Sequence, residues 1–443
     1  MALGFPALAT AGQVLYSTSF ENGLETWQNG PATVQTQVVH TGTSAVRLDA
    51  AWFYRDRTLP TTVPTLVKVS YWCRGPRFSN GNLYVGLASA DWVQHTYFSA
   101  YPSHPIWLGI GTGTESEPLF LDDVTVESAS PLDFLRHIHG LFNTWGASIS
   151  LNSSSRTQER LPKTFESLRT GRPLKLVMLG DSIVNDTFSS AWMELLPLHY
   201  PQAQITVHPS VRGSTGMDWY AADTDENGQP VDRLEEYVIT HRPDLVLLGG
   251  ISHKDNSEAY RTVIRKLRAK SPGLEILVST GMSGSVDPRA LQSWQFDVNP
   301  AGTGFRSRLC RLAEEEQVGF LDAQASWEKY IRDITLPYST FKRDSVHMNQ
   351  NGGYLAAEIM RNYFAEPCRT NLSLTVLEPA YAEDSFRFKL PTQANHTYTV
   401  ESTTSFKSNS WTFSMSLIGD GSVKSVAIPR SGEQESYFRV RQP

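Results

Sequence analysis

The feature that most constrains the fold is an alternation of short apolar runs with longer amphipathic stretches between residues 173 and 366. Apolar runs of strand length recur at 174–179, 205–208, 244–248, 274–278 and 318–321. Strands that alternate with helices indicate a parallel sheet covered on both faces. In such a sheet, function gathers at the carboxyl ends of the strands. We therefore expect an α/β domain over 173–366, with its site at that edge.

The remaining segments have a different texture. Residues 14–129 and 370–443 contain short alternating apolar and polar runs, punctuated by Gly, Asn and Pro. This pattern predicts a β-sandwich for each segment. Residues 130–172 lie between two domains and include a weak amphipathic stretch, so they are expected to form a helical connection. A chain of 443 residues is long enough for such a multidomain arrangement.

The composition excludes some functions. Charged residues make up 19% of the chain and the net charge is −6, whereas nucleic-acid binding needs clustered Lys and Arg. The sequence contains no run of about 18 apolar residues, so we expect no membrane span. Ala7-x-Ala9 and Ala9-x-Ala11 are typical of the end of a signal peptide. We expect a secreted or periplasmic protein of bacterial origin.

The cysteines do not form a metal-binding pattern. The chain has Cys73, Cys310 and Cys368, without a CxxC motif or a Cys/His cluster that would hold zinc. A disulfide between Cys310 and Cys368 and buried free thiols both remain compatible with the sequence.

A candidate nucleophile ends the first apolar run of the α/β segment. The run leads into Gly180-Asp181-Ser182, and a helix-like stretch follows. Ser182 is therefore expected at the carboxyl end of a strand, with its N–H at a helix N-terminus, where an oxyanion is stabilised. A serine hydroxyl alone is a poor nucleophile and needs an adjacent base.

The candidate base lies far downstream. Asp344 and His347 are three residues apart and precede the last helix-like stretch of the segment. One turn or tight loop can place such a pair together. The carboxylate would orient the imidazole, whose other nitrogen would take the proton of Ser182. Order and context, more than either motif alone, predict a catalytic triad of Ser182, His347 and Asp344.

This arrangement resembles the SGNH (GDSL-type) hydrolase superfamily over about residues 175–364. The first family block matches at Gly180-Asp181-Ser182, and the last matches at Asp344 and His347. The second block supplies an oxyanion glycine, which Gly213 matches. The resemblance implies a flavodoxin-like, three-layer α/β/α fold and ester hydrolysis that needs no cofactor.

The third family block departs from the pattern. The family usually has Gly-x-Asn-Asp, and the Asn amide donates to the oxyanion. Here the segment reads Gly249-Gly-Ile-Ser-His-Lys254, with Ile251 at the Asn position. Since an Ile side chain cannot donate, we expect Ser252 or His253 to supply the third oxyanion donor.

Three further residues are candidates for substrate binding. Trp219 and Tyr220 follow the Gly213 loop and are candidates for stacking on a sugar ring, with core packing as the alternative. Arg343 lies next to Asp344 and is a candidate for binding an acidic sugar, with a structural role as the alternative.

The segment 14–129 is similar to jelly-roll carbohydrate-binding modules. The likeness lies in Ser19-Phe-Glu-Asn-Gly23 with Trp27, and in the closing run 120–127. Such modules often hold a structural calcium between their first and last strands. Glu21 and Asp122 match those positions, and carboxylates suit this hard cation. Ordinary turn acids are the alternative.

These features together lead us to expect a carbohydrate O-acetylesterase that acts on an acetylated polysaccharide or oligosaccharide. The polysaccharide part depends on analogy with secreted multimodular esterases. A lipase or thioesterase of the same superfamily stays open. So does a non-catalytic polysaccharide-binding protein with a degenerate hydrolase domain, which Ile251 favours and the intact triad opposes.

Overall fold

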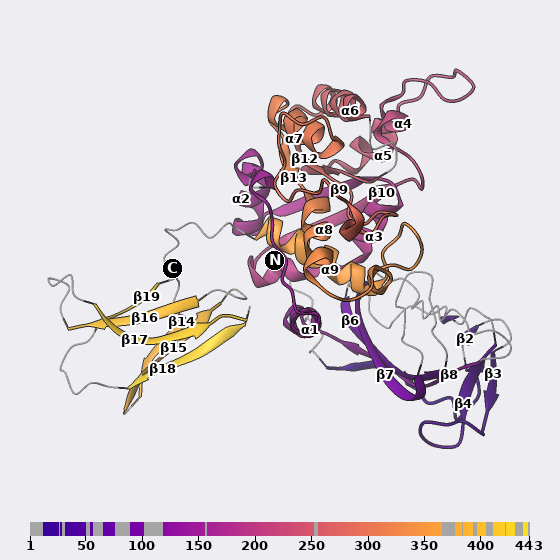
Figure 1. The fold of residues 1–443 in the computed structure, drawn as a ribbon, viewed down its shortest axis with the longest axis vertical. Coiled ribbons are helices and arrows are strands. Elements are labelled where there is room, and N and C mark those ends of the chain that lie inside the picture. The colour runs from indigo at the N-terminus through magenta and orange to yellow at the C-terminus, as the bar shows by residue number, and fades with distance from the viewer. Residues whose placement is uncertain are drawn as a thin grey trace, which may run out of the picture. The chain divides into compact units, whose positions relative to one another are not determined.

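The computed structural model describes most of the chain, in ranges 12–25, 27–28, 32–49, 54–55, 65–75, 89–101, 118–155, 157–251, 256–365, 377–382, 384–392, 397–404, 411–420, 422–429 and 437–441. Internal contacts divide the protein into two units, Met1–Glu366 and Pro367–Pro443. Figure 1 labels most of the helices and strands of the two units.

The N-terminal part of the first unit is an antiparallel sheet with strand order β3-β4-β8-β6-β7, in which β1 also pairs with β8. Strands β2 and β5 form a separate pair. The strands are β1 (Val14–Thr18), β2 (Trp27–Gln28), β3 (Ala32–Gln35), β4 (Ala45–Leu48), β5 (Tyr54–Arg55), β6 (Thr65–Gly75), β7 (Ser89–Tyr101) and β8 (Leu119–Ser128). Alternate residues of β6, from Val67 to Cys73, are buried in one hydrophobic cluster. The two facing sheets of a jelly roll stay a prediction, because the described residues form one large sheet and one short pair.

The segment expected to be a connection is part of the α/β core. It contains α1 (Pro131–Trp145), η1 (Ser153–Ser155), η2 (Gln158–Arg160) and α2 (Pro162–Thr170). Ser130 and Asp133 form a reciprocal capping box that starts α1 directly after β8. Phe134 of α1 and Phe165 of α2 are buried in the same cluster as the central sheet. Both helices therefore bury apolar faces beside the sheet, and the bounds of 130–172 as a separate connection stay a prediction.

The centre of the first unit is a five-stranded parallel sheet. Its strands are β9 (Pro173–Gly180), β10 (Gln204–Val211), β11 (Leu245–Leu248), β12 (Glu275–Ser279) and β13 (Gly319–Leu321). They pair in the order β10-β9-β11-β12-β13. In chain order this is 2-1-3-4-5, the flavodoxin-like arrangement, so the α/β prediction is confirmed.

Two hydrophobic clusters cover the two faces of this sheet. Along β9, Leu176 and Met178 belong to one cluster, and Val177 and Leu179 belong to the other. This alternation follows from the two-residue period of a strand. Helices that contribute to the first cluster are α1, α2, α3 (Ser182–Ser189), η3 (Trp192–Leu198), α8 (Ala323–Asp333), η6 (Tyr338–Phe341) and α9 (Gln350–Phe364). Elements that contribute to the second are α4 (Met217–Ala221), α5 (Arg233–Tyr237), η4 (Ile239–His241), α6 (Ser257–Lys270) and α7 (Phe305–Glu315). The short η5 (Pro288–Ala290) lies in the loop between β12 and α7.

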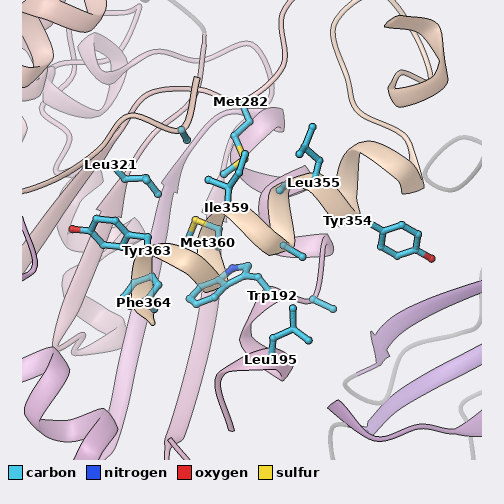
Figure 2. Packing of buried hydrophobic residues seen from close by; sticks show 14 of the residues in the cluster. Trp192, Leu195, Met282, Leu321, Tyr354, Leu355, Ile359, Met360, Tyr363 and Phe364 are labelled. Carbon is cyan, nitrogen blue, oxygen red and sulfur yellow. The ribbon is translucent and has the colours of Figure 1, made fainter. Parts of the chain in front are cut away.

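Helix α9 is buried along nearly its whole length. Its Leu355, Ile359 and Met360 point into the first cluster, where Figure 2 shows them beside Met282 and Trp192. The rings of Trp192 and Phe364 stack with centroids 5.1 Å apart. Since α9 follows the Asp344/His347 segment directly, its burial fixes the far end of that segment.

The N-terminal sheet contacts the beginning of α9. The backbone N–H of the β7 residue Phe98 donates to the Tyr354 hydroxyl at 3.3 Å, and the Gln350 amide donates to the Phe98 carbonyl at 3.2 Å. Phe98 also stacks on Phe134 of α1, with centroids 5.4 Å apart. The sheet and the α/β domain therefore share a packed boundary within one compact unit.

The second unit consists of two three-stranded antiparallel sheets, β14-β15-β18 and β17-β16-β19. Its strands are β14 (Leu377–Tyr381), β15 (Ser385–Pro391), β16 (Thr397–Thr403), β17 (Thr412–Ile418), β18 (Val423–Pro429) and β19 (Tyr437–Arg441). Side chains of both sheets, including Phe388 and Tyr398, form one hydrophobic cluster.

Two expectations about the whole chain concern cysteines and membranes. Cys73 and Cys310 are free thiols, and Cys368 lies outside the described residues. Among the described helices, none combines the length and the apolar character needed to cross a membrane.

Candidate active site

The Gly180-Asp181-Ser182 motif forms a tight turn between β9 and α3. Asp181 caps α3, because its Oδ1 accepts the backbone N–H of Ile183 at 2.9 Å. A side chain at Gly180 would place its Cβ 2.4 Å from the carbonyl oxygen of Gly249. The close approach of β9 and β11 therefore requires glycine there. Ser182 becomes the first residue of α3, at the carboxyl edge of the sheet.

The structure brings Ser182, His347 and Asp344 into one hydrogen-bonded chain. His347 Nε2 lies 2.8 Å from Ser182 Oγ, and His347 Nδ1 lies 2.8 Å from Asp344 Oδ2. The side chains of His347 and Asp344 are 26% and 48% exposed, so the chain opens to solvent. A hydroxyl, an imidazole and a carboxylate thus form one hydrogen-bonded chain, which is the arrangement that nucleophilic catalysis by a serine needs.

Asp344 is held by its own turn. Its Oδ1 accepts the backbone N–H groups of Val346 and His347, each at 2.8 Å, which leaves Oδ2 for the imidazole. Partial burial raises the pKa of Asp344, but the two backbone hydrogen bonds and the imidazole outweigh it and lower the pKa to about 2. Asp344 is therefore ionised at neutral pH.

A buried lysine supports the turn from behind. Lys342 Nζ donates to the Val346 carbonyl, the Ser283 hydroxyl and, at 3.0 Å, the Gly284 carbonyl. Burial lowers the pKa of Lys342 to about 8, against the opposing charge of Asp344. The lysine thus ties the His347 turn to the loop that follows β12.

Gly213 lies at the same edge of the sheet as Ser182. Val211, the last residue of β10, pairs with Gly180, and the next residue, Arg212, donates its N–H to the Gly180 carbonyl at 3.0 Å. Gly213 is exposed, and a Cβ added there would meet nothing within 4 Å. The space beside its backbone is therefore open at the position expected for an oxyanion donor.

Asp181 also fixes the segment that departs from the family pattern. Its Oδ2 accepts the backbone N–H of Ile251 at 2.7 Å, and a Cβ on Gly250 would clash with this carboxylate. The Ile251 side chain packs against the core cluster, where its Cγ2 would clash with any Cβ on Gly281. Ser252 and His253, the expected third oxyanion donors, lie outside the described residues.

The two aromatic candidates have partners within the protein. Tyr220 is 1% exposed, and its hydroxyl donates to the Gly180 carbonyl at 2.8 Å. Because Tyr220 has no open ring face, its expected sugar-stacking role does not fit, and it supports the nucleophile turn instead. Guanidinium carbons of Arg212 and Arg233 lie 4.4 and 4.0 Å from the ring centroid of the half-buried Trp219. These groups occupy space that a stacked sugar would need.

Arg343 turns inward. Its Nη1 donates to Asp186 Oδ1 at 3.0 Å and to the Met348 carbonyl at 2.9 Å. The side chains of Arg343 and Asp186 are 15% and 4% exposed. The structural alternative for Arg343 therefore fits, because its guanidinium is engaged by a buried carboxylate and is not presented to a sugar.

Glu21 and Asp122 each fasten a different part of the 40–44 turn. Glu21 Oε1 accepts the backbone N–H groups of Thr43 and Ser44, both at 2.9 Å. Asp122 Oδ2 accepts those of His40 and Thr41, at 3.0 and 3.2 Å. The described residues contain one group of three possible metal ligands, and it joins Asp122 to His40 and Asp123. That set contains a nitrogen donor, whereas calcium prefers oxygen donors, so it fits calcium poorly.

Sequence reasoning missed the supporting residues. Asp186 follows Ser182 by four positions, a spacing that puts both on one face of a helix and was available as a signal. The anchoring role of Lys342 had no sequence signal, because its partners Ser283 and Gly284 lie on a distant loop.

Comparison with known proteins gives matches in structure alone. No family model matches the sequence, and a search of the curated proteins finds no match. A two-domain esterase active on acetylated mannans is 14% identical, with a TM-score of 0.37 over 65% of this chain and 91% of that one. A protein described as a GDSL-like lipase, from Parabacteroides merdae, is 16% identical, with a TM-score of 0.33 over 43% and 95%. A peptidoglycan O-acetylesterase is 14% identical, with a TM-score of 0.27 over 80% and 81%.

The chain is thus similar in structure to proteins described as esterases and as a GDSL-like lipase. The similarity is distant in both identity and TM-score, so the substrates of those proteins are not transferred to this one. Its function is argued from the site geometry.

Proposed function

We propose that the protein is a serine esterase that removes O-acetyl groups from a polysaccharide, with Ser182 as nucleophile, His347 as general base and Asp344 as its orienting carboxylate. The observation that carries this proposal is the hydrogen-bonded chain from Asp344 through His347 to Ser182, with both steps at 2.8 Å. It lies at the carboxyl edge of a parallel sheet, where α/β enzymes bind ligands.

The geometry supports a two-step acyl transfer. Ser182 Oγ attacks the acetyl carbonyl while its proton passes to His347 Nε2, and the imidazolium then protonates the departing ester oxygen of the sugar, which becomes a hydroxyl. The C–O bond to the sugar breaks and leaves an acetyl group on Ser182. Water then attacks the acetyl carbon and gives its proton to His347, which returns a proton to Ser182 as acetate leaves.

Backbone N–H groups at Ser182 and Gly213 are the proposed oxyanion donors. The first stands at the N-terminus of α3, and the second adjoins open space at the end of β10. A third donor from Ser252 or His253 stays a prediction. Loss of one such donor costs about 3 kcal/mol of transition-state stabilisation, so a site with two donors still functions at a reduced rate.

The choice of a polysaccharide is supported by the N-terminal sheet. Trp92 of β7 is half-buried, and its ring meets that of His40 edge to face, with centroids 5.5 Å apart. Aromatic rings at a surface are suited to contacts with sugar rings. This proposal also places the protein in the periplasm or outside the cell, where such polymers occur.

Replacement of the nucleophile tests the esterase proposal. Ser182→Ala should lower turnover of an aryl acetate by several orders of magnitude, because a triad without its nucleophile retains only background catalysis. His347→Ala should lose a similar amount, and the double variant little more, since the residues act as one unit. Turnover of each folded variant is compared with that of wild type. More than about a tenth of wild-type activity in Ser182→Ala would reject Ser182 as nucleophile.

Substrate class is tested separately with the wild-type protein. Acetate release from a panel of acetylated glycans is measured beside hydrolysis of long-chain acyl esters and thioesters. A higher kcat/KM on glycans supports the proposal, and a higher value on long acyl chains supports a lipase or thioesterase. A properly folded wild-type protein without any ester hydrolysis would favour the non-catalytic binding protein.

A further inference from the structure

A buried ion pair connects the helix that carries the nucleophile with the turn that carries the base. Asp186 lies one helical turn after Ser182 on α3, and it is 5% exposed. Its Oδ1 accepts a hydrogen bond from Nη1 of Arg343, which immediately precedes Asp344. The pair therefore joins the two elements that carry Ser182 and His347.

Arg343 holds the chain around His347 at more than one point. Its guanidinium donates to the Met348 carbonyl at 2.9 Å, and its backbone N–H donates to the His347 carbonyl at 3.1 Å. Asp344, in contrast, accepts hydrogen bonds from its own turn and orients the ring relative to that turn. Contacts within the turn cannot set its distance from α3, whereas the link from Arg343 to Asp186 can.

The electrostatic interactions of Asp186 also connect the ion pair with His347. Burial raises the pKa of Asp186, and the Arg343 guanidinium opposes that rise. A positive charge on His347 also lowers the pKa of Asp186, which means that the two groups attract each other. By reciprocity, the Asp186 carboxylate favours the imidazolium that forms during catalysis. Among the described residues, the ionisable groups that interact electrostatically across α3 and the His347 turn are Asp186, Lys342, Arg343, Asp344 and His347.

We propose that Arg343, held by the buried Asp186, is a positioning residue that fixes His347 against Ser182. This inference rests on the proposed esterase function. It assigns Arg343 to the catalytic geometry and not to substrate binding. A displacement of about 1 Å in a reacting group lowers rates by about 100-fold, so a clamp at this place has a large effect on turnover.

The test uses Arg343→Met in the full-length protein, assayed with an aryl acetate. We expect kcat to fall about 100-fold while KM stays within about twofold, because the substrate does not contact Arg343. Arg343→Lys keeps the positive charge but lacks the planar guanidinium, so its kcat should lie between those of Arg343→Met and wild type. Wild-type kcat in Arg343→Met would overturn the proposal, as would a KM increase that accounts for the whole loss.

Asp186→Asn provides a second variant of nearly unchanged shape. It keeps a side-chain oxygen for Arg343 but removes the negative charge near His347. We expect the acid limb of the pH profile of kcat/KM to move to lower pH, because the imidazolium loses a stabilising charge. In the double variant Asp186→Asn/Arg343→Met both charges are gone, so the limb should return toward its wild-type position while kcat stays low. If the acid limb of the pH profile of Asp186→Asn stays at its wild-type position, the proposed electrostatic effect of Asp186 on His347 is wrong.

The matched control is Arg306→Met. Arg306 and Asp322 form another buried pair in the same domain, 2.7 Å apart, with side chains 17% and 0% exposed. Arg306→Met should lower the melting temperature of the protein but leave kcat and the pH profile unchanged. An equal fall in kcat would mean that any buried ion pair matters, and would overturn the specific role of Arg343.

An NMR measurement separates failure of the proposed esterase function from failure of the proposed positioning role of Arg343. An inactive wild-type protein would reject the esterase. In that case, the imidazole NMR signals of His347 still report the Ser182 contact, and an unchanged spectrum in Arg343→Met would reject the clamp independently.

Discussion

Two turns in the first unit are both held by carboxylates that accept backbone N–H groups. Only in one of them does a carboxylate oxygen stay available for another side chain. In the turn 344–347, Asp344 uses one oxygen for two backbone N–H groups and keeps the other for His347. In the turn 40–44, Glu21 and Asp122 give both of their oxygens to neighbouring N–H and hydroxyl groups. A carboxylate beside a turn is therefore a functional candidate only when an oxygen is left over.

The position of each turn explains the difference. Residues 344–347 follow η6 and precede α9, and buried side chains hold them at the edge of a parallel sheet. The 40–44 turn lies between β3 and β4 of an antiparallel sheet. Glu21 and the β8 residue Asp122 hold it by accepting its backbone N–H groups. Asp344 keeps one oxygen for the imidazole of His347, whereas Glu21 and Asp122 hold backbone N–H groups.

The largest expected effect is that of Asp344→Asn. It should lower kcat by about 10³-fold, because a neutral amide neither orients the reactive imidazole tautomer nor stabilises the imidazolium. The melting temperature should change little, since Asp344 is half exposed. Both are measured on the same preparation, by aryl acetate turnover and by thermal unfolding.

Asp122→Asn is its counterpart in the other turn. Asp122 is fully buried and accepts three backbone N–H groups, so its replacement should lower the melting temperature while kcat stays within about twofold. A large loss of kcat in Asp122→Asn without unfolding would contradict the division of roles between the two turns.

A smaller effect is expected from the titration of Lys342. Its pKa of about 8 lies below that of a free lysine, so above pH 8 the neutral amine has one donor fewer for three acceptors. The His347 turn should loosen and kcat should fall a few-fold, with an apparent pKa near 8. Stability should move in the opposite direction: between about pH 8 and 10.4 the unfolded state binds more protons, so this group makes the folded state more stable as pH rises.

Comparison with Lys342→Met separates the two effects. This variant should have a lower kcat at neutral pH and lack the alkaline limb near pH 8. Lys329→Met, which removes an exposed partner of Asp333, should keep that limb. An alkaline limb that persists in Lys342→Met would assign it to another group.

The sequence predicted that Ser182, His347 and Asp344 come together but not which residues hold them, for a physical reason. Gly180-Asp181-Ser182 specifies its own conformation, because the glycine, the helix cap and the first helical residue are adjacent. Asp344 and His347 are likewise joined by their own turn. Arg343 and Lys342, by contrast, depend on partners from α3 and from the loop after β12. A single sequence holds no sign of which distant carboxylate a buried cation will meet.

The same reasoning explains the outcome for the flanking regions. A parallel sheet could be expected from alternating strands and helices, since few arrangements bury both faces. Its strand order was implied only by the family resemblance. The amphipathic stretch in 130–172 predicts a helix that packs on a neighbouring domain, but its apolar face does not say which residues it covers. Tyr220 was ambiguous for a related reason: an aromatic residue after a cleft loop packs inward or outward according to space that the sequence does not reveal.

Tyr220→Phe should produce a modest change. It removes the hydrogen bond to the Gly180 carbonyl and leaves a buried acceptor with one partner fewer, at a cost of about 1 kcal/mol. We expect a melting temperature lower by a few degrees and an unchanged KM for acetylated glycans. An increased KM at constant melting temperature would restore the sugar-stacking role.

The smallest expected effect is that of calcium on the 40–44 turn. We retain the proposal that Glu21 and Asp122 hold this ion, although both already bind backbone N–H groups and an incoming cation must compete with them. A ligand that binds only the folded state stabilises it by about 1.4 kcal/mol at ten times its Kd, which is a rise of about 2–4 °C in melting temperature for a unit of this size. Thermal unfolding is measured with calcium and with a chelator, in wild type, Glu21→Gln and Asp122→Asn. A rise in wild type that disappears in both variants supports the site, and equal melting temperatures in wild type would discard it. A rise with zinc or manganese but not with calcium would assign the ion to His40, Asp122 and Asp123, because the imidazole nitrogen suits a transition metal.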